Sequence, residues 1–196
     1  MIMSIEPISG ETVYRSLLGH RAILMAANVR MTKGIAKGIM RAAKDFDSVI
    51  IFEIARSESN LEGGYTGMTP ADYASEVRKA AEEADWDMYV LHADHITIKT
   101  GSEEELEATR KLIGEQIKAG YTSYAIDASH LFNFKGGDLK EELRENIRCT
   151  TEMARFIEET YGCRDFGLEV EVGEIGKKDS EGMVRTSPEE AVTFLT

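Results

Sequence analysis

Short apolar runs alternate with longer amphipathic, charged segments along most of this 196-residue chain. The apolar runs are continuous, a pattern typical of parallel strands that are buried on both faces. They cover residues 21–27, 48–54, 88–92, 123–126 and 166–172. The amphipathic segments predict helices over residues 32–44, 70–84, 103–119 and 138–161. Strands that alternate with helices in this way indicate an α/β protein with a parallel sheet.

Local signals mark where several of these helices begin and end. A hydroxyl residue followed by Pro, or by Glu three positions later, is a helix-start signal and occurs at Thr69, Ser102 and Ser187. For Ser102 and Ser187 the spacing is that of a reciprocal capping box. Gly120 and Gly162 follow the predicted helices directly and are suited to end them in a left-handed conformation.

The spacing of the strand–helix units favours one α/β fold over another. Five units in 196 residues extrapolate to about 300 residues for eight units, the usual size of a (β/α)8 TIM barrel. The last segment, 187–196, begins a helix that no strand follows. We therefore expect a single domain, 1–196, that holds about the first five β-α units of a barrel and is truncated at its C-terminus. The alternative is a complete flavodoxin-like five-stranded sheet.

Composition narrows the function classes. Asp and Glu number 35 against 23 Lys and Arg, and the formal charge of −12 argues against nucleic-acid or anionic-membrane partners. No run approaches the roughly 18 apolar residues of a transmembrane helix, and the N-terminus does not resemble a signal peptide. Cys149 and Cys163 belong to no metal or redox motif, which predicts free thiols in a reducing cytoplasm.

Residues able to do chemistry gather where the predicted strands end. The run 88–92 ends in His92 and is followed, after Ala93, by Asp94 and His95. Two imidazoles and a carboxylate therefore lie at the end of one predicted strand. Asp127 and Glu171 interrupt the next two strands, where an unpartnered buried carboxylate would be costly. The carboxyl ends of barrel strands face one mouth, so these groups should converge there. Imidazoles and carboxylates together suit a divalent metal such as Zn²⁺.

Each of these residues also has an interpretation that needs no ligand. His92 can be a hydrogen-bonded core histidine, and Asp94 can cap a turn after its strand. The segment 127–130 (Asp-Ala-Ser-His) can be an N-cap or turn cluster. One of Glu169 and Glu171 can pair with a Lys or Arg across the barrel. The sequence alone leaves these alternatives open.

Several motifs together resemble those of the class II, metal-dependent ketose-bisphosphate aldolases. They are AANV at 26–29, LHADH at 91–95, AIDASH at 125–130 and EVEVGEIG at 169–176. The segment 63–72, GGYTGMTPAD, resembles the companion subunit of tagatose-bisphosphate aldolase. This resemblance spans nearly the whole chain. It implies a (β/α)8 fold and reversible cleavage of fructose- or tagatose-1,6-bisphosphate to dihydroxyacetone phosphate and glyceraldehyde 3-phosphate.

The resemblance also implies roles for individual residues. Zn²⁺ would polarise the ketose carbonyl. Its pocket would be lined by His95, Asp127 and Glu171. Asp94 would act as acid/base on the hydroxyl that becomes the aldehyde, and a loop acid, Asp179 or Glu181, would move the proton at the enediolate carbon. The residues expected to contact the phosphorylated sugar are Asn28, His92, Ser129 and His130.

The chain departs from the family pattern in two respects. Ile96 stands where the family has a small residue, and of the family's three metal histidines His95 is the one present. Two further functions therefore stay open: a non-catalytic companion subunit that stabilises an aldolase, and a sugar-phosphate isomerase or epimerase on the same fold. In either case we expect a cytoplasmic homodimer or higher homo-oligomer.

Overall fold

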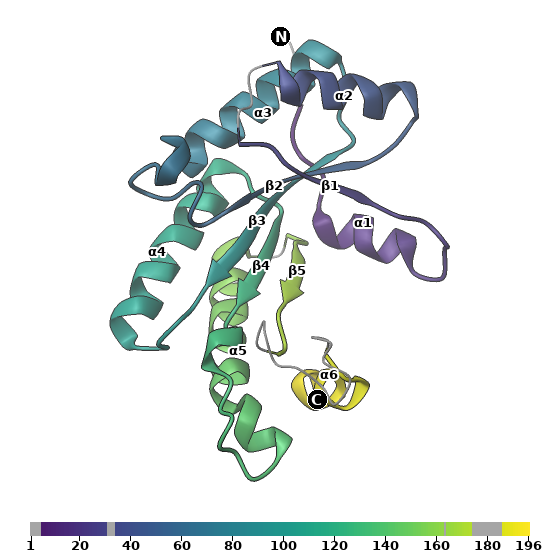
Figure 1. The fold of residues 1–196 in the computed structure, drawn as a ribbon. Helices are drawn as coiled ribbons and strands as arrows, with labels where there is room; N and C mark the ends of the chain where they lie inside the picture. The colour runs from purple at the N-terminus through teal and green to yellow at the C-terminus, as the bar shows by residue number, and fades with distance from the viewer. Residues whose placement is uncertain (1–4, 31–33, 163, 174–185) are drawn as a thin grey trace.

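The computed structural model describes residues 5–30, 34–162, 164–173 and 186–196. Its centre is a five-stranded parallel sheet in the order β1-β2-β3-β4-β5, seen in Figure 1. The strands are β1 (Met25–Asn28), β2 (Ile50–Ala55), β3 (Tyr89–Thr97), β4 (Ser123–Asp127) and β5 (Gly167–Val170). A flavodoxin-like sheet reverses its strand order once, whereas here each strand lies beside its neighbour in sequence. The order excludes that alternative and is the order of a (β/α)8 barrel.

The helices that connect the strands form a layer on the outer, convex side of the curved sheet (Figure 1). They are α2 (Ile35–Asp45), α3 (Pro70–Ala84), α4 (Glu103–Ala119) and α5 (Leu139–Tyr161). Near the C-terminus, α6 (Pro188–Leu195) packs against α5 through Phe194 and Leu143. Two short 3₁₀ turns, η1 (Gly64–Thr66) and η2 (Ser129–Leu131), follow β2 and β4.

The predicted helix starts are confirmed with one correction. Thr69 caps α3 and Ser187 caps α6, both with reciprocal capping boxes. Ser102 caps α4 by accepting from the backbone N–H of Glu105, but the return bond is missing. The Glu105 carboxylate accepts instead from the backbone N–H groups of Lys99, Thr100 and Gly101. The acid therefore anchors the β3–α4 loop rather than the cap residue.

Alternation along the strands separates an apolar outer face from an inner face that turns polar toward the mouth. Phe52 and Leu91 point outward into the core shared with the helices, and both are fully buried. On the inner face, Val90 is apolar near the amino end of its strand, whereas His92 and Asp94 follow toward the carboxyl end. The sheet thus places its polar side chains at one end of the concave surface.

One helix, α1 (Gly10–Leu17), was not predicted. It lies at the amino ends of the strands, where Gly10 N–H donates to Thr122 O at 3.1 Å and Val13 packs on Val90. Its eight residues are short for a periodicity signal, although Ser9 is a conventional N-cap. This helix covers the end of the barrel interior opposite the mouth.

Two strands depart most from their predictions, whereas the bounds of the other three differ by one or two residues. The first strand was expected over 21–27 and buried, but β1 is an edge strand in which Met25 is 63% exposed and the preceding Ile23 is 97% exposed. The third was expected over 88–92, yet β3 continues to Thr97 after a register shift between Ala93 and Ile96. Among the described residues, no helix is long and apolar enough to cross a membrane.

Candidate metal centre

An irregularity in β3 delivers two consecutive polar residues to the mouth. Pairing with β4 shifts register between Ala93 and Ile96, and His95 has a left-handed φ of 43°. Neighbours on a regular strand point to opposite faces, but this bulge leaves His95 Nε2 only 4.0 Å from Asp94 Oδ2. His95 was expected just past the strand. It lies within β3, because the bulge lets the strand continue. A non-glycine residue in this conformation is strained, and such strain often marks a functional site.

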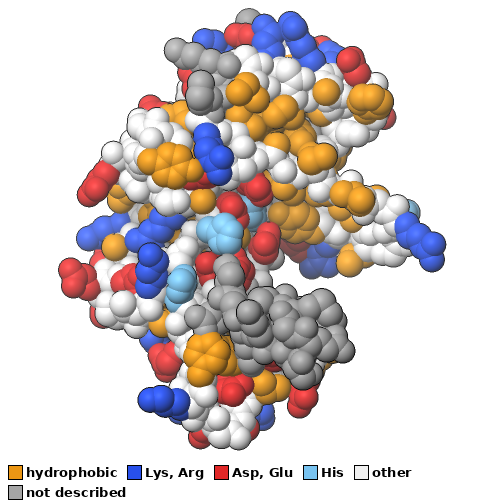
Figure 2. All heavy atoms as spheres, in the orientation of Figure 1, with side chains coloured by type: hydrophobic (Ala, Val, Ile, Leu, Met, Phe, Trp, Pro, Cys, Tyr) orange, Lys and Arg blue, Asp and Glu red, His pale blue; other side chains and the backbone are white. Residues whose placement is uncertain are grey.

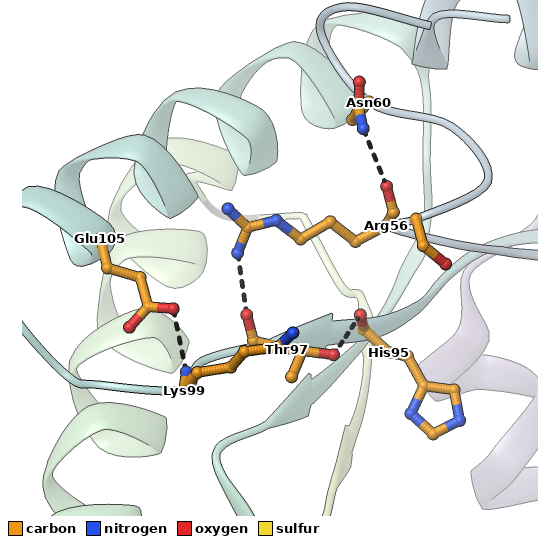
Figure 3. Close-up of a pocket in the computed structure, with 7 residues that line it drawn as sticks. Arg56, Asn60, His95, Thr97, Lys99 and Glu105 are labelled. Atoms are coloured by element: carbon orange, nitrogen blue, oxygen red, sulfur yellow. Dashed lines mark hydrogen bonds between the residues drawn. The ribbon is translucent and has the colours of Figure 1, made fainter. Parts of the chain in front are cut away.

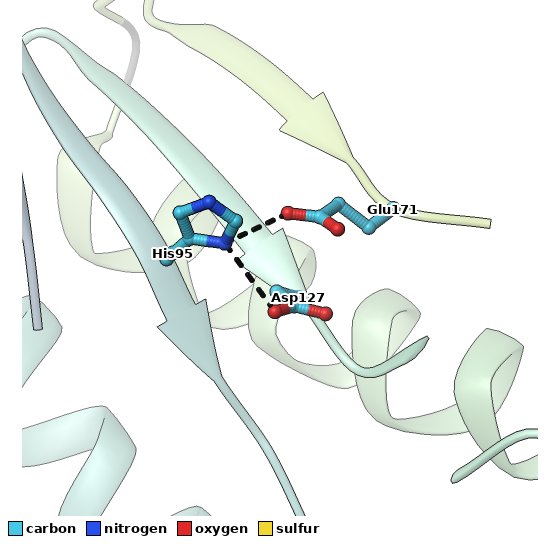
Figure 4. Close-up of side chains that lie close together, drawn as sticks. All are labelled: His95, Asp127 and Glu171. Carbon is cyan, nitrogen blue, oxygen red and sulfur yellow. Dashed lines mark hydrogen bonds and ion pairs between the residues drawn. The ribbon is translucent and has the colours of Figure 1, made fainter. Parts of the chain in front are cut away.

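Side chains from β3, from the end of β4 and from the residue after β5 meet at this point, as Figure 4 shows. His95 Nδ1 lies 2.9 Å from Glu171 Oε1 and 3.4 Å from Asp127 Oδ2. One ligand atom from each residue falls within 4.8 Å of the others. The structure thus brings together the three residues that the sequence predicts as a metal pocket.

Ser129 holds one carboxylate of this cluster, that of Asp127, by hydrogen bonds. Its backbone N–H and its hydroxyl both donate to Asp127 Oδ1, at 3.1 and 2.6 Å, which leaves Oδ2 directed toward His95. Both Ser129 and Asp127 are buried. Ser129 was predicted to contact substrate, and that role stays a prediction, because in the structure its hydroxyl holds the carboxylate of Asp127.

The charges at the mouth are crowded. Burial raises the pKa of the Glu171 carboxyl, and the nearby Asp127 raises it further. Burial likewise raises the pKa of Asp94. For His95, burial opposes protonation, but Asp94, Glu171 and Asp127 outweigh it and raise the imidazole pKa. A divalent cation in this cluster would relieve the repulsion between the carboxylates.

Two further acids stand on the same inner face. Glu53 on β2 pairs in register with His92, and its pKa is raised by burial and then by Asp94 and Glu169. Burial followed by Asp94 also raises the pKa of Glu169. The sequence contains a signal for Glu53, a lone carboxylate inside the apolar run 48–54, but Glu53 is not among the predicted site residues. Figure 2 shows acidic and histidine side chains gathered at the centre of this face.

His92 is a buried histidine, 2% exposed, that also faces the mouth. Its Nδ1 lies 2.7 Å from Ser123 Oγ, and its Nε2 lies 3.6 Å from Glu169 Oε2. Burial, and then the nearby His95, lower its pKa to about 4, so the ring is neutral near pH 7. The interpretation as a hydrogen-bonded core histidine holds for Nδ1, whereas a ligand contact remains open to Nε2.

Asn28 is engaged in a different cluster. Its side-chain amide donates to Glu58 Oε2 at 2.8 Å, and Glu58 also accepts from Arg30, from Ala55 N–H and from the Tyr65 hydroxyl. Burial of Glu58 opposes its ionisation, but the hydrogen bonds from Tyr65, Ala55, Arg30 and Asn28 outweigh it and lower the pKa to about 2. The cluster ties the end of β1 to the glycine-rich loop after β2. The predicted substrate contact of Asn28 stays a prediction.

The other residues predicted to form the site are His130, Asp179 and Glu181. His130 is exposed on η2. Asp179 and Glu181 lie outside the described residues. Beside β3 is a cavity of about 360 Å³ lined in part by Arg56, Lys99 and the backbone of His95. In Figure 3 the imidazole of His95 points away from this cavity, which therefore opens on the other side of the strand.

Sequential parallel strands, helices on the outer face and polar groups at the carboxyl ends define an α/β-barrel protein with its candidate site at the barrel mouth. A comparison with protein families identifies the family to which this barrel belongs. The family model "Fructose-bisphosphate aldolase class-II" matches residues 11–196. The chain belongs to this family, which confirms the resemblance seen in its motifs.

Individual relatives are more distant. The D-tagatose-1,6-bisphosphate aldolase subunit GatZ of Escherichia coli is 30% identical over 101 residues, which is 46% of this chain and 24% of the relative. A fructose-bisphosphate aldolase from Campylobacter jejuni superposes with a TM-score of 0.66 at 19% identity, covering 97% of this chain and 54% of that one. A probable tagatose 6 phosphate kinase from Sinorhizobium meliloti gives 0.60 at 18% identity, covering 87% and 41%.

The chain spans only part of the length of each of these relatives. The match spans about a quarter of the curated relative, and the chain covers about half of the aldolase structure. At under 20% identity the solved structures show the fold alone, which is the aldolase TIM-barrel fold. The described strands are five consecutive units of that fold.

Proposed function

We propose that this chain carries the metal and acid/base groups of a class II aldolase that cleaves a ketose bisphosphate, fructose- or tagatose-1,6-bisphosphate. The observation that carries the proposal is the meeting of His95, Asp127 and Glu171 within 4.8 Å, with Asp94 beside them. Family membership supports the reaction class.

The donor set fits a divalent metal. One imidazole nitrogen and two carboxylate oxygens would leave coordination positions open, as in catalytic zinc sites with three protein ligands. The same donors also suit Mn²⁺, so this set of ligand atoms specifies a divalent metal ion rather than one particular element. A bound divalent metal would act as a Lewis acid on the ketose carbonyl. His95 must be neutral to serve as a ligand, although its raised pKa favours protonation in the structure shown.

Asp94 is placed to be the acid/base. Its raised pKa and its position beside His95 suit a carboxylate that takes the proton of the substrate hydroxyl in cleavage and gives a proton to that oxygen in the reverse, condensation direction. As that proton leaves, the hydroxyl carbon becomes the aldehyde and the carbon–carbon bond breaks. The electron pair of that bond passes to the fragment that bears the ketose carbonyl, which leaves as the enediolate.

The test measures metal binding and retro-aldol cleavage separately. Titration calorimetry with Zn²⁺ and with Mn²⁺ should show one site, which His95→Ala should abolish and the exposed control His20→Ala should preserve. With triose phosphate trapped by a coupled dehydrogenase, Asp94→Asn should lower kcat by about 10²- to 10⁴-fold with metal binding unchanged. The exposed control Asp87→Asn should be silent. Metal binding that survives His95→Ala would refute the site.

A second candidate function is a companion subunit, which the local match to an aldolase subunit favours. In that case the chain with metal would show no cleavage by itself. It would instead raise the activity or the thermal stability of an added class II tagatose-bisphosphate aldolase. The same coupled assay, run with and without that enzyme, separates the two functions.

A further inference from the structure

A line of polar groups crosses the barrel interior from α1 to the mouth. The Tyr14 hydroxyl lies 2.8 Å from Ser123 Oγ, and Ser123 Oγ lies 2.7 Å from His92 Nδ1. On the far side of the ring, His92 Nε2 lies 3.6 Å from Glu169 Oε2. The four residues come from α1, β4, β3 and β5, so the line joins four elements that are far apart in sequence.

Two glycines, Gly10 and Gly167, leave the space that the hydroxyl groups of this line occupy. A Cβ on Gly10 would lie 2.8 Å from Ser123 Cβ, and one on Gly167 would lie 2.6 Å from both Ser123 Oγ and Tyr14 Cε2. Contacts this short are not tolerated between real atoms, so any side chain at either position would displace the serine or the tyrosine. The close packing holds both hydroxyl groups in place.

The hydrogen bonds of the line have one consistent direction. A neutral imidazole carries a single N–H, and the partner of one nitrogen decides which nitrogen carries it. The carboxylate of Glu169 is 58% exposed and accepts only, so an Nε2 lone pair facing it would be unfavourable. Nε2 therefore carries the hydrogen and Nδ1 accepts. Ser123 then donates to His92, and Tyr14 donates to Ser123.

We propose that Tyr14 and Ser123 are positioning residues that hold His92 in its Nε2–H tautomer and present that N–H as a donor at the mouth. The acceptor is an oxygen, either the carboxylate of Glu169 or a hydroxyl or carbonyl oxygen of a bound polar ligand. None of these residues belongs to the metal cluster, so the inference stands or falls independently of the aldolase proposal. It also gives the unpredicted helix α1 a role in the site.

The experiment is a long-range ¹H–¹⁵N correlation spectrum of the imidazole rings in the ¹⁵N-labelled full chain at neutral pH. His92→Gln assigns the His92 signals by their loss. We expect the wild-type ring to show an unprotonated Nδ1 and a protonated Nε2. Ser123→Ala should move both shifts toward a mixture of tautomers, and Tyr14→Phe should move them less in the same direction. Tyr161→Phe is the matched control, because the Tyr161 hydroxyl donates to Tyr121 O at 3.0 Å and is not part of this line.

Two results would overturn the proposal. One is a wild-type spectrum in which Nδ1 carries the hydrogen, a result that requires no variant to fold. The other is a Ser123→Ala protein that unfolds cooperatively, as wild type does, and keeps wild-type His92 shifts. If the hydroxyl groups only filled space, Ser123→Ala would leave the His92 shifts at their wild-type values, because alanine fits where serine does.

Discussion

At the scale of single residues, Ser129 orients one carboxylate of the candidate metal site without being one of its three proposed ligands. Its two hydrogen bonds to Asp127 Oδ1 hold the carboxylate so that Oδ2 faces His95. In Ser129→Ala the hydroxyl bond is lost and the carboxylate gains rotational freedom. We expect metal affinity to fall about 10- to 100-fold, the usual effect of removing such a support.

Calorimetric titration with Zn²⁺ measures this change. Ser75→Ala, the same substitution at an exposed position of α3, is the control and should leave the affinity as it is. An unchanged affinity in Ser129→Ala would mean that backbone N–H donation alone orients Asp127. Ser129 would then regain the substrate role that its place in the sequence suggests.

At the scale of elements, Glu58 connects the end of β1 with the loop after β2. It is 2% exposed and accepts four hydrogen bonds, from Asn28, Arg30, Ala55 and Tyr65. Glu58→Gln keeps the shape but places an amide N–H₂ against these donors. We expect a loss of about 1–3 kcal/mol in the free energy of unfolding, measured by urea denaturation.

The neighbouring Glu62→Gln, at an exposed site, should change the free energy of unfolding little. The effect of Glu58 also has a defined pH range. Its pKa is about 2 in the folded chain, below the ordinary value of 4.5 for a glutamate, so its stabilisation is complete above that higher value. The stabilisation should be lost as the pH falls toward about 2, and Glu58→Gln should remove this part of the acid sensitivity. Equal acid profiles for the two proteins would contradict it.

Two glycines should respond to alanine with opposite signs. Gly64 in the loop after β2 has φ of 55°, and a Cβ there would lie 2.5 Å from the backbone C and O of Glu58. Gly114 lies within α4, and a Cβ would meet nothing within 4 Å. We expect Gly64→Ala to lower Tm and Gly114→Ala to stabilise by about 0.5–1 kcal/mol. Calorimetric scans that order the two variants the other way would be incompatible with this backbone.

At the scale of the whole molecule, β1 is an edge strand of the sheet that the described residues form. Ile23 and Met25 are exposed at this edge, and apolar side chains on an edge strand form a surface that promotes association. We expect the 196-residue chain to self-associate at micromolar concentration. Ile23→Lys should shift sedimentation profiles toward the monomer, whereas Phe46→Lys should not, because Phe46 is also strongly exposed but lies directly after α2. Identical profiles for both variants would place the contact elsewhere.

Much of the architecture is readable from the chain because local rules decide it. Continuous apolar runs located four of the five strands closely, and the start of α3 at Pro70 was predicted to the residue. Failures came where neighbours decide the outcome. β1 has strand-like residues yet is exposed, because burial depends on what lies beside it. The extension of β3 to Thr97 depends on a bulge that forms only against β4.

The sequence by itself determined the order of the elements, the polarity of the strand ends and the family. Periodicity, caps and motifs are local, and parallel strands must bring their carboxyl ends to one edge. Only the tertiary structure decided which groups touch. It joined His95 to Asp127 and Glu171, bound Asn28 to Glu58, and brought Tyr14 of α1 to His92 through Ser123. These contacts depend on strand register and on space left by glycines, and both properties arise between elements that no local pattern relates.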